Sequence, residues 1–341
     1  MGAAGVIDLR ALIYYSIAIL VSISVVGATL AIMGYDIVQG YVSFLFSGFI
    51  DIRSLGLFSV KFTSLYLLGL AFSIPLAARR FNVGNEGQFL LGAIGASIAG
   101  ILFGDIPAFI LIPAVLLFSV LLGLLWSSIP ALLLYVFKVN EIVSTILLNF
   151  IAFQLVNYVA LSPLRDVFAG HPMTIPISES ARLSSLIGGS SLNAGLSIAI
   201  VCGVIIYIYT YRTVYGYELQ AAGANPIAAS KHGINAKVLG PMSLAIGGVF
   251  AGLAGGIEVA GYHYRLIEGM QGFYAPLSII AALMAKGDPR YLLLSSFYVT
   301  LVDIGSSALQ RTLGVPAELS LIIAGLSMLL IMIAEYVKER R

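Results

Sequence analysis

Polar side chains gather at one point of an otherwise apolar sequence, in the segment Arg-Arg-Phe-Asn-Val-Gly-Asn-Glu-Gly-Gln at 79–88. Asn85 with Gln88 three residues later resembles a capping box, and a carboxylate at Glu86 is favoured near a helix N-terminus. One cap needs fewer polar groups than this segment holds. The segment therefore also predicts a polar site on a solute pathway, formed by Asn82, Asn85, Glu86 and Gln88.

A second set of polar side chains falls inside apolar stretches, at Asn149, Asn157, Glu258 and Asp303. Ionisable groups in lipid are costly and usually face the interior of a helix bundle or a water-filled cavity. Glu258 and Asp303 are thus pathway candidates, although a helix end reached by water explains each equally well. Asn149 and Asn157 share one helix face, because they lie eight residues apart. They either line a cavity or bond between helices.

Residues for metal binding or catalysis are not grouped in this sequence. His171, His232 and His263 are distant from one another and from acidic clusters, so we expect no metal site. The phosphate-loop pattern Gly-x-x-x-x-Gly-Lys-Ser/Thr is missing, and no convincing Ser-His-Asp set appears. The one cysteine, Cys202, lies in an apolar run. The sequence therefore predicts a chain that is not an enzyme and needs no cofactor of its own.

The elements that hold these residues are predicted to be membrane-spanning helices. The 341 residues are 60% hydrophobic and 10% charged, whereas a soluble domain carries about 25% charged residues. A span needs about 20 apolar residues. Ten segments qualify: 11–34, 62–78, 86–103, 107–136, 142–161, 193–211, 239–260, 270–285, 291–309 and 319–336. Segment 270–285 is the shortest and could be a half-helix, while Pro113 and Pro130 predict a kink or tilt in 107–136.

The placement of basic residues predicts the orientation. With a cytoplasmic N-terminus, 12 of the 18 Lys and Arg residues fall on the cytoplasmic side, as the positive-inside rule requires. We therefore expect an all-α integral membrane protein: a polytopic bundle of about 8–10 transmembrane helices, with both termini cytoplasmic and one domain over 1–341. Its larger loops are 162–192 outside and 212–238 inside. The net charge of +2 does not indicate nucleic acid.

The inner loop is punctuated like two short helices. The first covers about 217–222 and stops at Gly223, a suitable left-handed residue. The second begins with Asn225 as N-cap and Pro226 at the first helical position, and ends at Gly233. A helix of about seven residues needs a surface to pack on. Two interpretations are equally supported: a loop packed on the protein's own spans, and a docking element for another protein.

Small residues recur every four positions in two spans, as Gly92, Ala96 and Gly100 and as Gly248, Gly252, Gly256 and Ala260. Such rows let helices approach closely in lipid. They predict tight helix packing, with faces that slide during a conformational cycle as the alternative.

Four segments in the same order resemble the permeases of ABC importers for nucleosides and simple sugars, the ribose and branched-chain amino acid type of binding-protein-dependent permease. They are Phe-Asn-Val-Gly-Asn-Glu-Gly-Gln from Phe81, Asn-Glu-Ile-Val-Ser-Thr from Asn140, the loop 216–235, and Gly-Phe-Tyr-Ala-Pro-Leu-Ser from Gly272. Two departures from the family pattern fall in or just after the last segment. Phe-Tyr-Ala-Pro replaces the more usual Phe-x-Gly-Ile, and the later Lys-Gly-Asp-Pro-Arg replaces a Gly-rich turn.

The resemblance implies a multi-pass permease of the plasma membrane with several partners. An extracytoplasmic binding protein would deliver the solute, a second permease subunit would complete the pathway, and cytoplasmic ATPase subunits would bind the ATP. The coupling role maps to Gly216, Glu218, Ala222, Gly223, Asn225, Pro226, Ala229 and Gly233.

Three solute classes follow from the resemblance, in a definite order. Nucleosides lead because of the segment from Asn140 and the Ser-Pro-Leu-Arg-Asp run at 162–166. Simple sugars such as ribose come second, and branched-chain amino acids third. An ATP-independent secondary transporter or channel is the alternative from a different class. It predicts buried charges that form an ion route and needs no docking loop.

Overall fold

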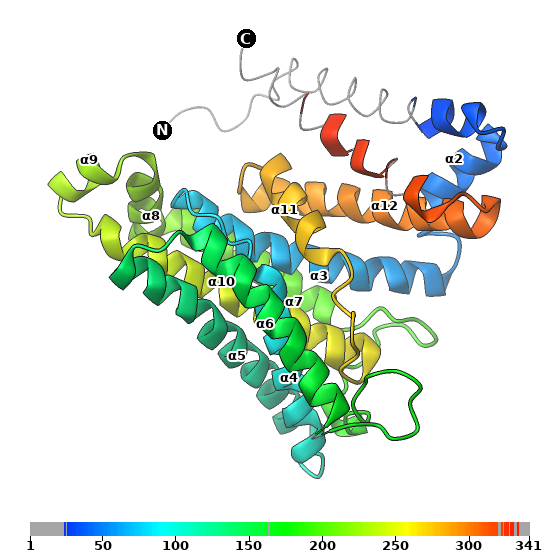
Figure 1. Ribbon diagram of the computed structural model, residues 1–341, viewed down its shortest axis with the longest axis horizontal. Helices are drawn as coiled ribbons and strands as arrows, with labels where there is room; N and C mark the ends of the chain where they lie inside the picture. Colours follow the sequence, from blue (N-terminus) through cyan, green and yellow to red (C-terminus); the bar gives the residue numbers. More distant parts are fainter. Residues whose placement is uncertain are drawn as a thin grey trace. The chain divides into compact units, whose positions relative to one another are not determined.

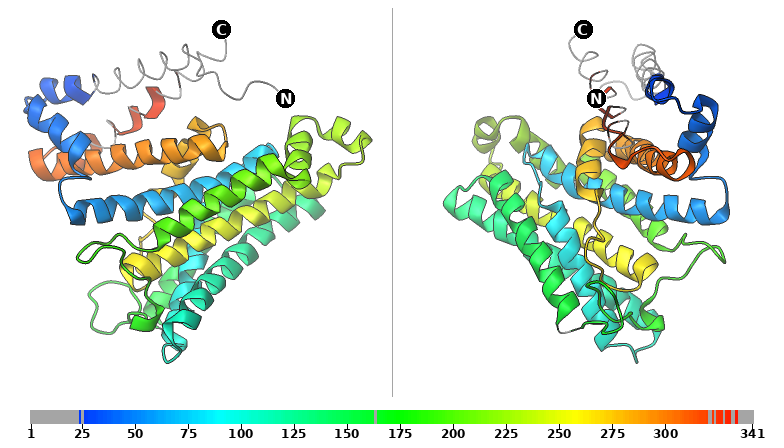
Figure 2. Two further views of the ribbon diagram at one scale, coloured as in Figure 1. Left: turned by 180° about the vertical axis from the view of Figure 1, so that it is seen from behind. Right: turned by 45° about the vertical axis from the view of Figure 1, so that its right-hand side comes forward.

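A computed structural model describes residues 24, 26–162, 164–319, 322, 324–326, 328–330 and 333, and over this part the fold is all-α, with only isolated bridges between extended residues (Figures 1 and 2). Six of the described helices are long and apolar enough to cross a membrane. The predicted all-α polytopic membrane fold is therefore confirmed, while the cytoplasmic placement of the termini stays a prediction. The chain divides into two compact units, Met1–Phe58 with Phe297–Arg341 and Ser59–Ser296.

The second unit holds the elements of interest. They are α3 (Ile52–Ala77, its larger part), α4 (Asn85–Leu102), α5 (Ala108–Phe137), α6 (Glu141–Leu161), α7 (Gly195–Arg212), α8 (Val214–Ala224), α9 (Pro226–Lys231), α10 (Ala236–Glu258), α11 (Tyr274–Met284) and the start of α12 (Pro289–Leu313). Each span predicted between residues 62 and 309 coincides with a helix. The spans predicted at 11–34 and 319–336 lie largely outside the described residues.

Three helices refine the prediction. The 11 residues of α11 reach only about 17 Å, whereas the hydrocarbon core is about 30 Å thick, so α11 has the length of a half-helix. The helix α4 forms as predicted, although it is not among the six helices that qualify as membrane spans by length and composition. The helix α5 continues through Pro113 and Pro130 for 30 residues.

Glycine rows bring α10 against α4 and α5, and the three helices lie side by side in both views (Figures 1 and 2). A Cβ atom added to Gly92 of α4 would overlap with the backbone of Gly252. One added to Gly123 of α5 would overlap with the carbonyl oxygen of Gly248. Close approach of this kind requires residues without a side chain. The packing interpretation of the small-residue rows is confirmed.

The second unit has two distinct ends. At one end, the loop 164–194 lies against the segment 259–267: the N–H of Ile177 donates to the carbonyl of Tyr264 at 2.8 Å, and the N–H of Thr174 to that of Leu266 at 3.0 Å. We call this the loop end. At the other, α8 and α9 lie beside the first turns of α10. We call this the α8–α9 end.

The first unit contains a helix that the sequence did not predict, α2 (Ile37–Phe46), capped by the Asp36 side chain. The residue Thr312 of α12 donates to Ser43 of α2 at 3.0 Å. Asp303, the pathway candidate in this unit, is half-buried.

Candidate functional site

The polar segment before α4 folds into a buried amide network. Asn82 and Gln88 exchange two hydrogen bonds, each 2.9 Å long, between their side-chain amides. Both residues are almost fully buried. A buried amide needs such partners, because leaving it unpaired costs about 1–3 kcal/mol. The pair therefore fixes the turn between α3 and α4, and its own hydrogen-bonding capacity is largely occupied.

The predicted capping box at Asn85 is wrong. The residue before it, Gly84, is the N-cap of α4 and makes no side-chain cap. The Asn85 amide instead donates to Ser278 of α11 at 3.1 Å, and Gln88 is held by Asn82. Both side chains therefore make tertiary hydrogen bonds instead of capping the N-terminus of α4. Glu86 does lie in the first turn of α4 as predicted, half-buried.

The asparagines of α6 have different environments. The side chain of Asn149 accepts from the N–H of Gly87 at 2.9 Å and donates to the carbonyl of Val83 at 3.0 Å. Asn149 thus bonds between helices, which was one of its two interpretations. Asn157, two turns later, is half-buried, and its Oδ1 has no partner among the described residues.

Glu258 lies at the centre of a second polar cluster. Its side chain is only 1% exposed. Ser64 of α3 donates to Oε2 of the carboxylate, Tyr274 of α11 donates to Oε1 at 3.2 Å, and Nε2 of His263 lies 3.4 Å from Oε1. The interpretation of Glu258 as a helix end reached by water is therefore wrong. A carboxylate that accepts from two hydroxyl groups and lies beside an imidazole nitrogen is an acceptor site inside the unit, which we call the Glu258 cluster.

A π-helical turn explains why the sequence did not reveal His263. The α10 helix ends at Glu258, and the turn Val259–His263 is a π-helix. In an α-helix, the residues that face each other are three or four positions apart, whereas His263 follows Glu258 by five. The wider π turn brings His263 back to Glu258, which corrects the expectation that His263 is distant from acidic groups. Turns of this kind often mark functional sites. Within the described ranges, however, no three His, Cys, Asp or Glu side chains form a metal-binding group.

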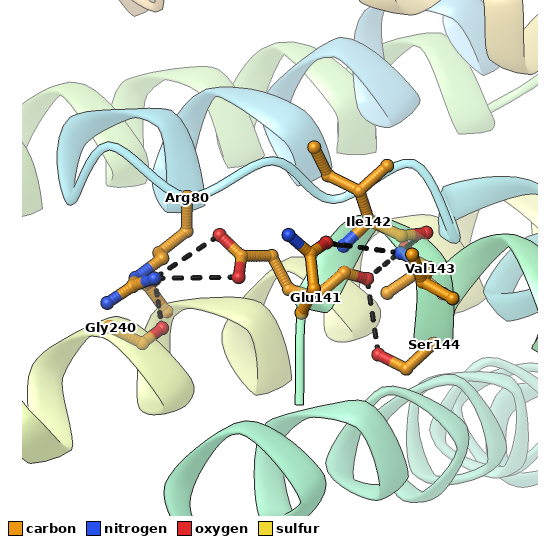
Figure 3. Close-up of polar contacts among 9 residues, drawn as sticks. Arg80, Glu141, Ile142, Val143, Ser144 and Gly240 are labelled. Carbon is orange, nitrogen blue, oxygen red and sulfur yellow. Dashed lines mark hydrogen bonds and ion pairs between the residues drawn. The ribbon is translucent and has the colours of Figure 1, made fainter. Parts of the chain in front are cut away.

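A further ion pair lies at the α8–α9 end. Arg80 Nη1 is 3.4 and 3.5 Å from the two carboxylate oxygens of Glu141, whose side chain is 10% exposed (Figure 3). Asn140 begins α6 by accepting from the N–H of Ile142 at 2.8 Å. The guanidinium also lies beside α10, where a Cβ added to Gly240 would be 3.1 Å from its Nε. The pair joins the start of α6 to the turn after α3, and no local pattern in the sequence indicates it, because the two residues are 61 positions apart.

The inner loop forms two helices, one of them longer than predicted. The α8 helix begins at Val214, because the Thr213 side chain caps it by accepting from the N–H of Gly216 at 3.2 Å. The prediction that Gly223 ends this helix in a left-handed conformation is wrong. Gly223 remains inside α8, where a Cβ would overlap with the carbonyl oxygen of Ala77. Close contact with α3, rather than a turn, requires this glycine.

The second helix of the loop matches its prediction. Asn225 accepts from the N–H groups of Ile227 and Ala228 at 3.1 and 3.0 Å, Pro226 opens α9, and Gly233 has a φ of +82°. The remaining coupling candidates divide by burial. Gly216, Ala222 and Ala229 are buried against the unit, Glu218 is half-buried, and most of α9 is exposed.

Comparison with known proteins places the chain among transport permeases. It is 30% identical over 335 residues (95% of this chain, 88% of the relative) to the glucose ABC transporter permease protein TsgB13 of Haloferax volcanii. It is 31% identical over 309 residues (89% and 87%) to the guanosine ABC transporter permease protein NupP of Bacillus subtilis. The nucleoside ABC transporter permease protein NupB of Lactococcus lactis is 30% identical over 298 residues (84% and 81%).

The family model described as the permease component of the branched-chain amino acid transport system matches residues 54–332. That range covers most of the chain and includes the amide network, the Glu258 cluster, α8 and α9. The six apolar helices agree with a multi-pass protein of the plasma membrane. The chain therefore belongs to this family of ABC permease components.

Proposed function

We propose that this permease conducts a nucleoside through the membrane, and that ATPase subunits drive it by docking on α8 and α9. One observation supports the docking most directly: α8 and α9 have one side fixed and one side open. Gly223 touches α3, and Ala229 is buried, whereas Ala228 is exposed. A partner that moves the open side would move the ends of α3 and α10 with it.

The family implies the partners in general terms, and we propose their placement on this geometry. ATP would be bound by the separate ATPase subunits, so the chain itself needs no cofactor. The α8–α9 end would face the cytoplasm together with both termini, and an extracytoplasmic binding protein would deliver the solute at the loop end. A second permease subunit, identical or related, would complete the pathway.

The Glu258 cluster supports a hydroxyl-bearing solute. Its carboxylate accepts hydrogen bonds from neutral hydroxyl groups of Ser64 and Tyr274, and the hydroxyl groups of a ribose could replace them. Guanosine and glucose, named for two of the relatives, both carry such groups. We therefore rank nucleosides first and simple sugars second. A branched-chain amino acid has no ring hydroxyl groups and ranks third. The amide network, with Asn157 and Glu86, is proposed to line the same pathway.

Reconstitution tests the transport class. The chain is placed in liposomes with and without its ATPase and binding-protein partners, and uptake of labelled guanosine, ribose and leucine is measured. We expect guanosine uptake only with ATP and all partners present. Uptake by the chain alone would instead identify a secondary transporter or channel, and preferential uptake of ribose or leucine would reverse the ranking of solutes.

Docking is tested at Ala228, which is exposed on α9. Ala228→Arg adds bulk and charge to the open side and should reduce ATPase binding at least about tenfold, the loss typical of a disrupted interface centre. Ala108→Arg is the matched control, since Ala108 is exposed at the start of α5, near the loop end. Equal ATPase binding by both variants would rule out α9 as the docking element.

A further inference from the structure

Two adjoining hollows lie along α5 and α10 at the α8–α9 end. The first has a volume of about 560 Å³ and is bounded by the ends of α5 and α3, by α9 and by the start of α10. Four basic residues line it, and no acidic residue does: Arg80, Lys138, Lys231 and Lys237. We call this hollow the basic pocket.

Most of the positive charge of the basic pocket is not compensated. Arg80 is paired with Glu141. Lys138 donates to the carbonyl of Tyr135 at 2.7 Å, which orders the ammonium group without neutralising it. Within the described part of the chain, no ion pair involves Lys138, Lys231 or Lys237, and all three are exposed. Three like charges around one hollow repel each other, so an anion bound there is favoured.

The second hollow is apolar and continues the first. It has a volume of about 600 Å³ and lies between α5 and α10. Pro241 lines both hollows, so they adjoin. Leu132, Tyr135 and Met242 form its exposed apolar wall, one to two turns further into the spans than the lysines. We call this hollow the apolar groove. Basic charge at a span end followed by apolar surface along the span matches the two parts of a lipid.

We propose that the basic pocket and the apolar groove together bind one anionic phospholipid. The phosphate would lie among Lys138, Lys231 and Lys237, and an acyl chain would lie against Leu132 and Met242. Basic pockets between spans on the cytoplasmic side are known to bind anionic headgroups, and the groove selects a lipid over a free phosphate. The proposal stands on these two hollows and on the proposed cytoplasmic orientation of the α8–α9 end, and it does not depend on the solute or on ATPase docking.

Because Lys231 and Ile227 of α9 line the pocket, a bound lipid would touch the docking element from its membrane side. The exposed Ala228 is not part of the lining and remains free for a partner. Lipid binding and ATPase docking would therefore use different faces of the same short helix.

Native mass spectrometry of the purified full chain tests the proposal. Binding is compared for phosphatidylglycerol and phosphatidylcholine of equal chain length, and for inorganic phosphate. We expect the chain to retain phosphatidylglycerol at least about tenfold more tightly than phosphatidylcholine, given the effect of each basic residue near an anionic headgroup. The combined variant Lys138→Gln, Lys231→Gln and Lys237→Gln should lose this preference.

Two controls separate the alternatives. The variant Arg79→Gln, Arg165→Gln and Arg212→Gln removes the same charge from exposed residues that do not line the pocket, and it should keep the preference. If it loses the preference equally, only general surface charge acts and the proposal fails. If the triple variant does not fold, the single variants Lys138→Gln, Lys231→Gln and Lys237→Gln are measured instead, and each should weaken the preference for phosphatidylglycerol.

The groove is tested with Leu132→Ser and Met242→Ser, which should weaken binding of long-chain but not short-chain phosphatidylglycerol. Unchanged long-chain binding, together with phosphate binding as tight as that of the lipid, would show a small-anion site and overturn the lipid assignment. Equal retention of the two lipids by the unmodified chain would overturn it as well.

Discussion

Glu258 keeps a carboxylate in the interior of the second unit with hydrogen-bond donors around it. Glu258→Ala leaves the groups of Ser64 and Tyr274 without their acceptor, which should lower the free energy of unfolding by about 1–3 kcal/mol. Glu258→Gln retains an acceptor oxygen and should cost less. Thermal unfolding in detergent measures both, with exposed Glu179→Ala as the control. Equal midpoints for the three variants would contradict the cluster.

Asp288 provides a pH-dependent contribution at the start of α12. Burial alone would raise its pKa, but hydrogen bonds from Arg290 and Tyr211 outweigh burial and hold the pKa of Asp288 below the usual 3.8. A lowered folded-state pKa stabilises the fold above the unfolded value, and this stabilisation is lost as the pH falls through the folded value.

Asp288→Asn should therefore destabilise the protein at pH 7, and the difference from the unmodified chain should shrink below about pH 4. Unfolding midpoints of both proteins across this range measure the effect. A constant difference at every pH would mean that the carboxylate charge is not involved.

At the same scale, the sequence identified the polar residues better than their roles. Residue types alone pointed to Glu258 and to the amides of Asn82 and Gln88. The partners of Asn85 and Glu258 were not predictable, because Ser278 lies almost 200 positions from Asn85 and His263 is brought to Glu258 only by a π turn.

Among the elements, α9 depends most on a single residue. A helix of six residues is not stable alone, and Asn225 satisfies two of its free N–H groups. Asn225→Ala should cost about 1 kcal/mol of local stability and speed amide exchange across Ile227–Lys231 about fivefold, as measured by hydrogen–deuterium exchange. Asn235→Ala is the matched control, because Asn235 precedes α10 without a side-chain cap. Similar exchange rates in both variants would show that the Asn225 cap does not stabilise α9.

The close approach of α10 to its neighbours makes a second prediction at this scale. Gly252→Val places a side chain against the backbone of Ser119 and Gly123, and should lower the free energy of unfolding by at least about 1–3 kcal/mol, as overpacking does. Gly188→Val is the control, since nothing lies within 4 Å of a Cβ there. A Gly252 variant that unfolds at the unmodified temperature would show that the helices can separate freely.

Element positions followed well from hydropathy, and element ends followed less well. The spans between 62 and 309 coincide with helices because apolar length is a strong signal. The sequence predicts too late a start for α8, because a Thr cap such as Thr213 is a weak local signal. It predicts a left-handed turn at Gly223, because tight packing and a left-handed turn both favour glycine. The unexpected α2 is too short to register as a span.

At the scale of the whole molecule, the orientation remains a prediction that chemistry can test. The chain has one cysteine, Cys202, which is buried, so introduced cysteines can be labelled with little background. Ala228→Cys should react with a membrane-impermeant maleimide only from the cytoplasmic side, and Ala108→Cys only from outside. Labelling in intact and opened cells separates the two, and the reverse pattern would invert the proposed topology.

The family could be inferred from four short segments, whereas the two compact units could not. Segments such as Asn140–Thr145 carry local patterns that survive in a linear sequence. The division of the chain depends on contacts between residues near Ser43 and Thr312, which no local pattern records.

The helix α10 begins at Ala236, beside α9 and the basic pocket, and ends at Glu258. Its 23 residues extend about 35 Å, and its glycine faces offer few interlocking side chains to resist rotation about its own axis. A small rotation of the first turn of α10 would thus change the direction in which the Glu258 carboxylate points. One continuous helix would then transmit motion from the proposed ATPase-docking end to the Glu258 cluster.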